Sequence, residues 1–303
     1  MKIAFAGAGA VGCHYGSKLV QAGFDVILLA RGRHLTVMQG AGLRHESEGE
    51  CKQVAVKATS DAGQLKFSQV VVLSCKMTGF VEMVDLLRGH ISPAALLLTL
   101  QNGVEAPEQL AEAFPDHAIA AGTAFIGVRL EQPGYVIHSA AGGIRMGLWQ
   151  QGRGEQYLLP LIRAFQHAEV PARQDNDPEA MLWRKLLWNC GFNAITAITR
   201  RYARDMAAGA ETLAIVRKAM EEAVEIAKVC NIAIGEQDIL KHIDVTLNMG
   251  PVKTSMWQDI EAGRKTEVEY INGYVVRKAD ELNMPAPVNR LLMSLIKAIE
   301  RGR

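Results

Sequence analysis

The chain has 303 residues, enough for one large core or, as two textures along the sequence indicate, two domains. Its net charge is +1 and its acids and bases are interspersed, which argues against a nucleic-acid-binding protein. The five cysteines are scattered without a CxxC pair, which argues against a disulfide framework and a metal site and indicates reduced thiols. The N-terminal apolar run is short and broken by glycine, and no apolar stretch approaches about twenty residues, so we expect a cytoplasmic, soluble protein that makes no membrane contact.

A glycine fingerprint follows the first predicted strand. The run Met1–Ala6 leads into Gly7-x-Gly9-x-x-Gly12, and a helical pattern continues from Val11 to Ala22. In a dinucleotide-binding turn, the first glycine permits a tight turn, the second admits a pyrophosphate and the third lets the helix pack against the strand. The N–H groups that open the helix then face the phosphates. The predicted cofactor loop consists of Gly7, Ala8, Gly9, Ala10, Val11 and Gly12; the alternative is a glycine-rich turn that binds nothing.

The end of the second strand indicates which dinucleotide is bound. Asp25–Ala30 is predicted as this strand, and it is followed by Arg31, Gly32 and Arg33 where an NAD site would place an acid. A guanidinium matches phosphate oxygens in bidentate geometry, so Arg31 favours NADPH through its 2′-phosphate. The alternative is that both arginines are solvated loop charges.

The rest of the first half alternates short apolar strands with helical patterns, as a doubly wound α/β sheet of the Rossmann type requires. Val70–Ser74 and Ala94–Leu100 are continuous apolar runs, typical of strands buried on both faces. Lys76 and Asn102 come just after these runs, at the strand ends where such sheets bind ligands. The other predicted elements are a hairpin of 42–46 with 53–58, strands at 119–128, 134–138 and 144–149, and a helix at 155–168.

The texture changes after the polar turn Asp175–Pro178. We therefore predict a cofactor domain at 1–176 and an all-helical domain at 177–303, which would cover the ligand edge of the sheet and form a cleft. Helical periodicity runs over 179–200, 211–230, 236–248, 267–283 and 288–301.

The first helix of the second domain carries a narrow polar stripe. Lys185, Asn189 and Asn193 are spaced i, i+4, i+8 and share one helical face amid leucine, tryptophan and phenylalanine. Buried polar groups need partners, and a polar substrate could supply them. The alternative is that the asparagines bind loop carbonyls.

A second constellation consists of Ser255, in a loop begun by Gly250 and Pro251, and Glu267, which opens the next helical pattern. Helix capping and placement near a helix dipole are adequate structural explanations for these two residues in isolation.

Together these residues resemble the ketopantoate (2-dehydropantoate) 2-reductase family, from the first strand to the last helices. The matching pieces are the glycine fingerprint, Arg31, Lys76, Gln101-Asn102-Gly103, Trp183-x-Lys185-Leu-x-x-x-Asn189-x-x-x-Asn193-x-x-Thr196-Ala197, Ser255-Met-x-Gln-Asp259 and Thr266-Glu267-x-x-x-Ile-Asn-Gly273. The segment after His138 reads Ser-Ala-Ala-Gly-Gly143, which departs from the family's usual glycine spacing, and His138 itself is expected to be structural.

The resemblance implies a Rossmann domain followed by a helical domain like that of 6-phosphogluconate dehydrogenases, and NADPH-dependent reduction of ketopantoate to pantoate, a step toward pantothenate and coenzyme A. It assigns Lys185 as the general acid and Glu267 as the residue that holds Lys185 or a substrate hydroxyl. It also implies substrate-binding roles for Asn189, Asn193 and Ser255, a bridging role between substrate and cofactor for Asn102, and cofactor contacts for Lys76 and Arg31.

Two alternatives stay open. The same machinery could reduce another branched or hydroxylated 2-oxo acid, or the chain could be a non-catalytic NADP-binding sensor, which would leave Lys185 and Glu267 without a purpose. The oligomeric state is also open, with a homodimer as the candidate assembly because helical domains of this kind often pair.

Overall fold

The computed structural model describes residues 1–302 and contains two compact units. The N-terminal unit consists of Met1–Gln101 and Glu105–Pro178. The helical unit consists of Asn102–Val104 and the chain from Glu179 onward. The short segment Asn102–Val104 therefore belongs with the helical unit, although it lies far from the other residues of that unit in the sequence.

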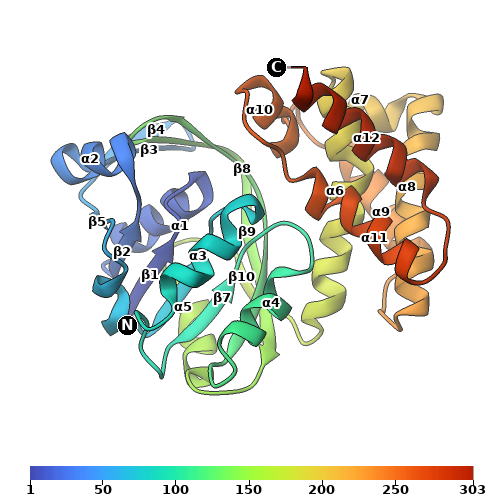
Figure 1. The fold of residues 1–303 in the computed structure, drawn as a ribbon. Helices are drawn as coiled ribbons and strands as arrows, with labels where there is room; N and C mark the ends of the chain where they lie inside the picture. Colours follow the sequence, from blue (N-terminus) through green and yellow to red (C-terminus); the bar gives the residue numbers. More distant parts are fainter. Residues whose placement is uncertain (303) are drawn as a thin grey trace. The chain divides into compact units, whose positions relative to one another are not determined.

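A mixed sheet forms the centre of the N-terminal unit (Figure 1). Its strand order is β4-β3-β9-β8-β7-β6-β1-β2-β5, with β10 paired to β9. The run from β8 through β7, β6, β1 and β2 to β5 is parallel, which confirms the predicted Rossmann-type sheet. The strands are β1 (Lys2–Ala6), β2 (Asp25–Leu29), β3 (Leu43–Ser47), β4 (Glu50–Val54), β5 (Lys57–Thr59), β6 (Val70–Leu73), β7 (Leu96–Thr99), β8 (Ile119–Gln132), β9 (Tyr135–Gln150) and β10 (Ala172–Gln174).

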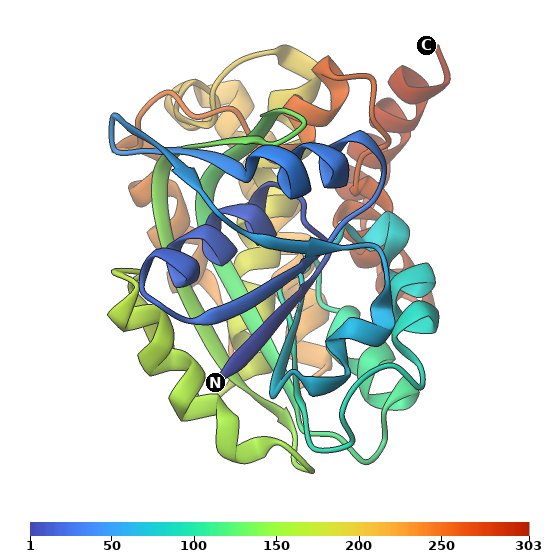
Figure 2. The same cartoon turned by 90° about the vertical axis from the view of Figure 1, so that its left-hand side faces the viewer.

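Helices pack on the sheet in pairs, α1 beside α5 and α3 beside α4. The α-helices of this unit are α1 (Ala10–Gln21), α2 (Gly32–Ala41), α3 (Phe80–Leu87), α4 (Ala106–Ala113) and α5 (Leu158–His167). Short 3-10 helices lie at η1 (Ala62–Phe67), η2 (Met77–Gly79) and η3 (Glu155–Tyr157). Figure 2 turns these N-terminal elements toward the viewer, with β1 starting at the label N.

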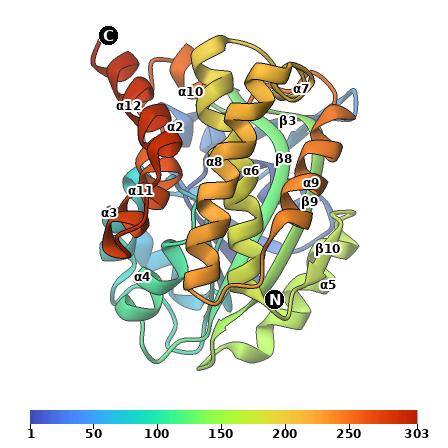
Figure 3. The ribbon, with the colours of Figure 1, turned by 90° about the vertical axis from the view of Figure 1, so that its right-hand side faces the viewer.

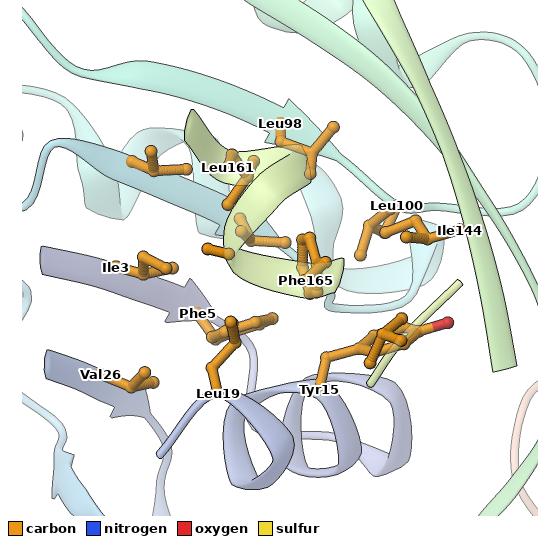
Figure 4. Packing of buried hydrophobic residues seen from close by; sticks show 14 of the residues in the cluster. Ile3, Phe5, Tyr15, Leu19, Val26, Leu98, Leu100, Ile144, Leu161 and Phe165 are labelled. Atoms are coloured by element: carbon orange, nitrogen blue, oxygen red, sulfur yellow. The ribbon is translucent and has the colours of Figure 1, made fainter. Parts of the chain in front are cut away.

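The core of the N-terminal unit lies between the sheet and the α1–α5 pair. Figure 4 shows Tyr15 of α1 and Phe165 of α5 beside apolar strand residues such as Phe5, all of them fully buried. Each buried side chain of this size contributes about 1.5–3 kcal/mol to stability. The core therefore holds α1, whose first turn contains the last fingerprint glycine, Gly12, firmly against β1.

Two predicted strand patterns differ in detail from the structure. The hairpin is present, but its arms are β3 and β4, and residues 57–59 form β5 beside β2 instead. The turn lies at Glu48 and Gly49, both with positive φ, a backbone that Asn-Gly signals more clearly than Glu-Gly does. The strands predicted at 119–128, 134–138 and 144–149 are β8 and β9, one long hairpin whose register shifts interrupt the alternation of side chains.

A helix was also missed. The sequence pattern assigned no element to the residues after Arg31, but α2 begins at Gly32, with Arg31 as its N-cap residue. Gly32 has φ +59°, a left-handed backbone conformation that glycine tolerates. A glycine at the first helical position also masks the helical pattern in the sequence.

The helical unit confirms the predicted all-helical second half (Figure 3). Its helices are α6 (Pro178–Thr199), α7 (Ala203–Ala208), α8 (Ala210–Val229), α9 (Glu236–Leu247), α10 (Ser255–Glu261), η4 (Val268–Tyr270), α11 (Asn272–Glu281) and α12 (Pro287–Arg301). The single helix predicted at 267–283 is divided into η4 and α11, because Ile271 between them has non-helical backbone angles (φ −111°, ψ −90°).

The helix α6 is the buried axis of this unit. It lies against α8, where Cys190 Sγ is 3.7 Å from the carbonyl oxygen of Ala219, and it accepts a hydrogen bond at Cys190 O from the side chain of Asn272 (2.9 Å). Asn272 also donates to Asn289 of α12 over 2.9 Å. Burial on almost every side explains why its sequence is apolar all round, apart from the polar stripe. Among the described residues, none of the helices has the length and apolar character needed to cross a bilayer.

Candidate functional site

A cleft of about 560 Å³ lies at the carboxyl ends of β1, β2 and β6 in the N-terminal unit. It brings together five of the predicted cofactor residues, Gly7, Ala8, Gly9, Arg31 and Lys76. Ala10, Val11 and Gly12 follow in the first turn of α1 and are not part of the lining. The remaining lining residues, which sequence reasoning did not select, are Leu29, Ala30, His34, Ser60, Cys75, Thr78, Gly79, Glu82, Met83 and Leu86.

The three fingerprint glycines meet different surroundings. A Cβ on Gly7 would lie 2.5 Å from the backbone nitrogen of Cys75, and a Cβ on Gly12 would lie 2.4 Å from the carbonyl oxygen of Gly7. A Cβ on Gly9 would meet nothing closer than 4.0 Å. The fold itself thus requires glycine at Gly7 and Gly12, whereas the space at Gly9 is open. This space, next to a helix start that no side chain caps, suits a diphosphate.

Hydrogen bonds tie the strand ends around this cleft together. Ser74 Oγ donates to the carbonyl oxygen of Gly7 over 2.8 Å, and Gln101 Nε2 donates to the carbonyl oxygen of Cys75 over 3.1 Å. Lys76 and Asn102 are the next residues after Cys75 and Gln101. These bonds among the ends of β1, β6 and β7 therefore fix the backbone that directly precedes Lys76 and Asn102. Gln101 belongs to the recognised Gln-Asn-Gly motif, but its bonding could not be inferred from one sequence.

Lys185, the residue expected to act as an acid, lies on α6 and is buried in the helical unit. Burial lowers the pKa of its ammonium group to about 8, and the charge of Glu267 opposes this by favouring the protonated form. The two residues predicted to work together are thus electrostatically coupled. Glu267 is also buried, at 6 % exposure, although it comes from a segment 82 residues later in the sequence.

The two asparagines of the stripe are buried on the same face of α6 and contact each other. Asn193 Nδ2 lies 3.3 Å from Asn189 Oδ1, and the exposed fractions are 1 % and 4 %. The other two polar atoms, Asn189 Nδ2 and Asn193 Oδ1, are buried without a partner. Most buried polar groups in proteins are hydrogen-bonded, so this unpaired donor and acceptor indicate a site for a polar ligand. The loop carbonyls proposed as alternative partners do not satisfy these two atoms.

Asn102 lies in this cluster. Its Nδ2 donates to Glu267 Oε2 over 2.8 Å. The following residue, Gly103, has φ +89°, and a Cβ there would lie 2.7 Å from the carbonyl oxygen of Tyr270. Glycine is thus needed to let the segment after β7 pack against η4. Asn102, which was also expected to contact the cofactor, does not line the cleft described above.

Ser255 lies differently from its expected place in a loop, because it is the first residue of α10 and is exposed. The cap of α10 is Thr254, whose Oγ1 accepts from the backbone N–H of Trp257 over 3.3 Å. The same oxygen is 2.8 Å from Thr196 Oγ1 on α6, three residues after Asn193. Thr254, the neighbour of Ser255, thus contacts α6 just beyond the stripe. Helix capping therefore does not explain Ser255. It does not explain Glu267 either, because the Glu267 side chain caps no helix.

Comparison with known proteins matches both parts of the chain to the same family. A family model described as ketopantoate reductase PanE/ApbA matches residues 3–151, and a model for the C-terminal part of the same family matches residues 177–300. A 2-dehydropantoate 2-reductase of Nostoc sp. strain PCC 7120 is 29 % identical over 303 residues, covering 99 % of this chain and 95 % of the relative.

Solved structures show the same architecture. The PanE/ApbA family ketopantoate reductase of Ralstonia eutropha JMP134 is 32 % identical, with a TM-score of 0.91 over 100 % of this chain and 99 % of the other. A D-mandelate dehydrogenase solved with NADH and anilino(oxo)acetate has a TM-score of 0.93 over 100 % and 99 % of the two chains. Its identity is 24 %, so the likeness is one of fold.

Proposed function

The chain belongs to the ketopantoate reductase PanE/ApbA family, and we propose that it reduces ketopantoate to pantoate with NADPH. The observation that carries this proposal is the buried cluster of Lys185, Glu267, Asn189 and Asn193, in which a charged pair adjoins two unpaired amide atoms. A purely structural cluster would be expected to satisfy its own polar atoms. An oxygen-rich substrate such as a hydroxylated 2-oxo acid would complete it.

NADPH is proposed over NADH because of Arg31. This arginine is exposed at the end of β2, lines the cleft and is the N-cap residue of α2, while the open space at Gly9 suits a diphosphate. The residues present thus suit a dinucleotide that carries an additional phosphate on its ribose. Lys76, in the same cleft, is proposed to contact the cofactor on the nicotinamide side.

The role proposed for Lys185 follows from the charge that the reaction creates. A bound NADPH would supply the hydride for the carbonyl carbon, and negative charge would then develop on the carbonyl oxygen. The Lys185 ammonium stabilises this charge and gives a proton to the oxygen. A pKa of about 8 leaves most of the lysine protonated at pH 7 and makes it a stronger acid than an exposed lysine. Glu267 preserves the protonated form and orients the group.

The amide stripe and Ser255 are proposed to hold the substrate. Asn189 Nδ2 can donate to a carboxylate or hydroxyl oxygen, and Asn193 Oδ1 can accept from a hydroxyl group. Asn102, bound to Glu267, is proposed to bridge substrate and cofactor. The homodimer considered above stays a prediction.

A single assay separates the substrate candidates. Purified protein is mixed with NADPH and a panel of 2-oxo acids that includes ketopantoate, an unhydroxylated branched acid and an aromatic acid, and oxidation is followed at 340 nm. We expect the largest kcat/KM with ketopantoate. A larger value with another acid would reassign the substrate, and binding of NADPH with no turnover on any acid would favour the sensor.

A further inference from the structure

His34 lies in the wall of the cleft, three residues after Arg31 and half-buried in the first turn of α2. Its Nδ1 is 2.9 Å from the backbone nitrogen of Gly134, which can only donate. Nδ1 is therefore the acceptor, and the proton of the neutral ring is on Nε2. Burial lowers the pKa of His34, which favours this neutral form.

The opposite side of the ring faces the cofactor loop. His34 Nε2 is 3.4 Å from Cys13 Sγ, and that thiol donates to the carbonyl oxygen of Ala8 over 3.3 Å. The Nε2–H group is thus linked through Cys13 to Ala8, the residue between the first two fingerprint glycines.

The turn that holds Nδ1 is itself fixed. The carbonyl oxygen of Gly134 accepts from the backbone N–H of Arg44 over 2.8 Å, so both backbone groups of this residue are bonded. A Cβ at Gly134 would lie 2.2 Å from Val37 Cγ1 of α2, and its φ of +77° also requires glycine. The tip of the β8–β9 hairpin therefore packs tightly on α2. His34 joins three parts of the unit: this tip, the start of α2 and the cofactor loop.

We propose that His34 is a positioning residue that sets the spacing between the diphosphate loop and Arg31, and thereby the preference for NADPH over NADH. The inference rests on the proposed function, in which Arg31 binds the 2′-phosphate. NADPH must reach two phosphate sites at once, and their separation on the molecule is limited by its covalent structure. NADH has no 2′-phosphate and occupies only the diphosphate site of the two. Its binding is therefore insensitive to where Arg31 lies.

Two substitutions test the two contacts of the ring separately, because each keeps one contact and removes the other. His34→Gln can place an amide N–H near the position of Nε2 and keep the bond to the loop. His34→Asn can place an amide oxygen near the position of Nδ1, keep the bond to Gly134 and lose the loop. Dissociation constants of NADPH and NADH are measured by nucleotide fluorescence on the full chain, with no substrate present.

We expect His34→Asn to weaken NADPH binding by about tenfold and NADH binding by less than about twofold, since tenfold is about 1.4 kcal/mol, the upper range for one hydrogen bond. His34→Gln should keep a preference for NADPH within about threefold of the unsubstituted chain. Equal losses for both nucleotides, or equal loss of preference in the two variants, would overturn the proposal. Should His34→Asn fail to fold, Cys13→Ala tests the same link, with a smaller loss for NADPH alone expected and an unchanged preference contradicting it.

Arg31→Ala, measured alongside, separates this inference from the proposed function. If Arg31→Ala abolishes the NADPH preference and His34→Asn leaves it intact, only the role of His34 is wrong. If the unsubstituted chain binds both nucleotides equally, the assignment of NADPH fails and the role of His34 fails with it.

Discussion

Asn102 Nδ2 donates a 2.8 Å hydrogen bond to Glu267 Oε2, joining residues that are 165 positions apart in the chain. Asn102 lies three residues after the end of β7, and Glu267 directly precedes η4. The bond is reinforced one residue later, where Gly103 packs against the backbone of Tyr270. The carboxylate that acts on Lys185 is thus held by the loop that follows a Rossmann strand.

The buried ammonium makes the activity pH-dependent on the basic side. The proposed acid is active only when protonated, so kcat/KM should fall as pH rises through the pKa of Lys185, about 8, well below the ordinary 10.5. Lys185→Met should lower kcat by about two to four orders of magnitude while NADPH still binds. Steady-state rates between pH 6 and 10 and nucleotide titrations measure both effects, and near-normal turnover by the variant would refute the acid role.

Glu267→Gln should move that pH profile. Glu267 raises the pKa of Lys185, so removing its charge should shift the basic limb of kcat/KM to lower pH, whereas the amide keeps an oxygen for Asn102. The control is Glu261→Gln, which changes a carboxylate of the helical unit that pairs with Lys253 instead. A limb that stays in place in Glu267→Gln would show that the two groups are not coupled.

The fingerprint glycines should separate folding from cofactor binding. Gly9→Ala meets open space and should leave the melting temperature unchanged within about 2 °C while weakening NADPH and NADH alike, because its methyl group occupies the diphosphate space. Gly12→Ala places a Cβ 2.4 Å from the Gly7 carbonyl oxygen and should lower the melting temperature clearly. Calorimetry and nucleotide titration test the pair, and unchanged binding by Gly9→Ala would contradict the site.

The amide stripe should show opposite effects on stability and on substrate binding. In the double substitution Asn189→Leu/Asn193→Leu, two unpaired buried atoms disappear, so the free energy of unfolding should not decrease. The KM for the 2-oxo acid should rise at least about tenfold, because about 1.4 kcal/mol of polar contact is lost. Urea unfolding and substrate kinetics measure the two. A less stable protein with normal KM would identify the stripe as structural.

A buried histidine cluster should make the N-terminal unit sensitive to acid. His14 Nδ1 is 3.0 Å from His45 Nε2, and burial, with nearby charges including His138 and Lys18, lowers the pKa of His14 to about 2 and of His45 to about 4. The unfolded chain takes up these protons near pH 6.5, so stability is full above that pH and is lost as pH falls from about 6.5 toward 4. The free energy of unfolding should drop less between pH 7.5 and 5.0 in His45→Gln, by about 1–2 kcal/mol. An unchanged difference in urea titrations would contradict this.

Local patterns predicted the fold well where the hydrophobic periodicity of an element agrees with the residues that begin and end it. The glycine fingerprint, the buried runs that became β6 and β7, and the long helices α6, α8, α9 and α12 all carry such signals. The short α2 was missed because its first residue is glycine, and the β8–β9 hairpin was predicted in pieces because register shifts break the alternation. These features depend on packing between distant segments, which a single sequence does not display.

The candidate site divides in the same way. The stripe of Lys185, Asn189 and Asn193 follows from helical spacing, and its burial was implied by the apolar residues around it. The bond from Asn102 to Glu267 and the contact between Thr196 and Thr254 join segments that no periodicity relates. The family resemblance selected Glu267 and Ser255, while the contacts around them depend on the three-dimensional fold.

The grouping of Asn102–Val104 with the helical unit bears on how this chain could be recombined with its relatives. A chimaera joined at the apparent domain boundary near Pro178 would combine one parent's Asn102 and Gly103 with the other parent's Glu267 and Tyr270. Functional exchange of helical units should therefore require a three-residue graft from the same donor as well.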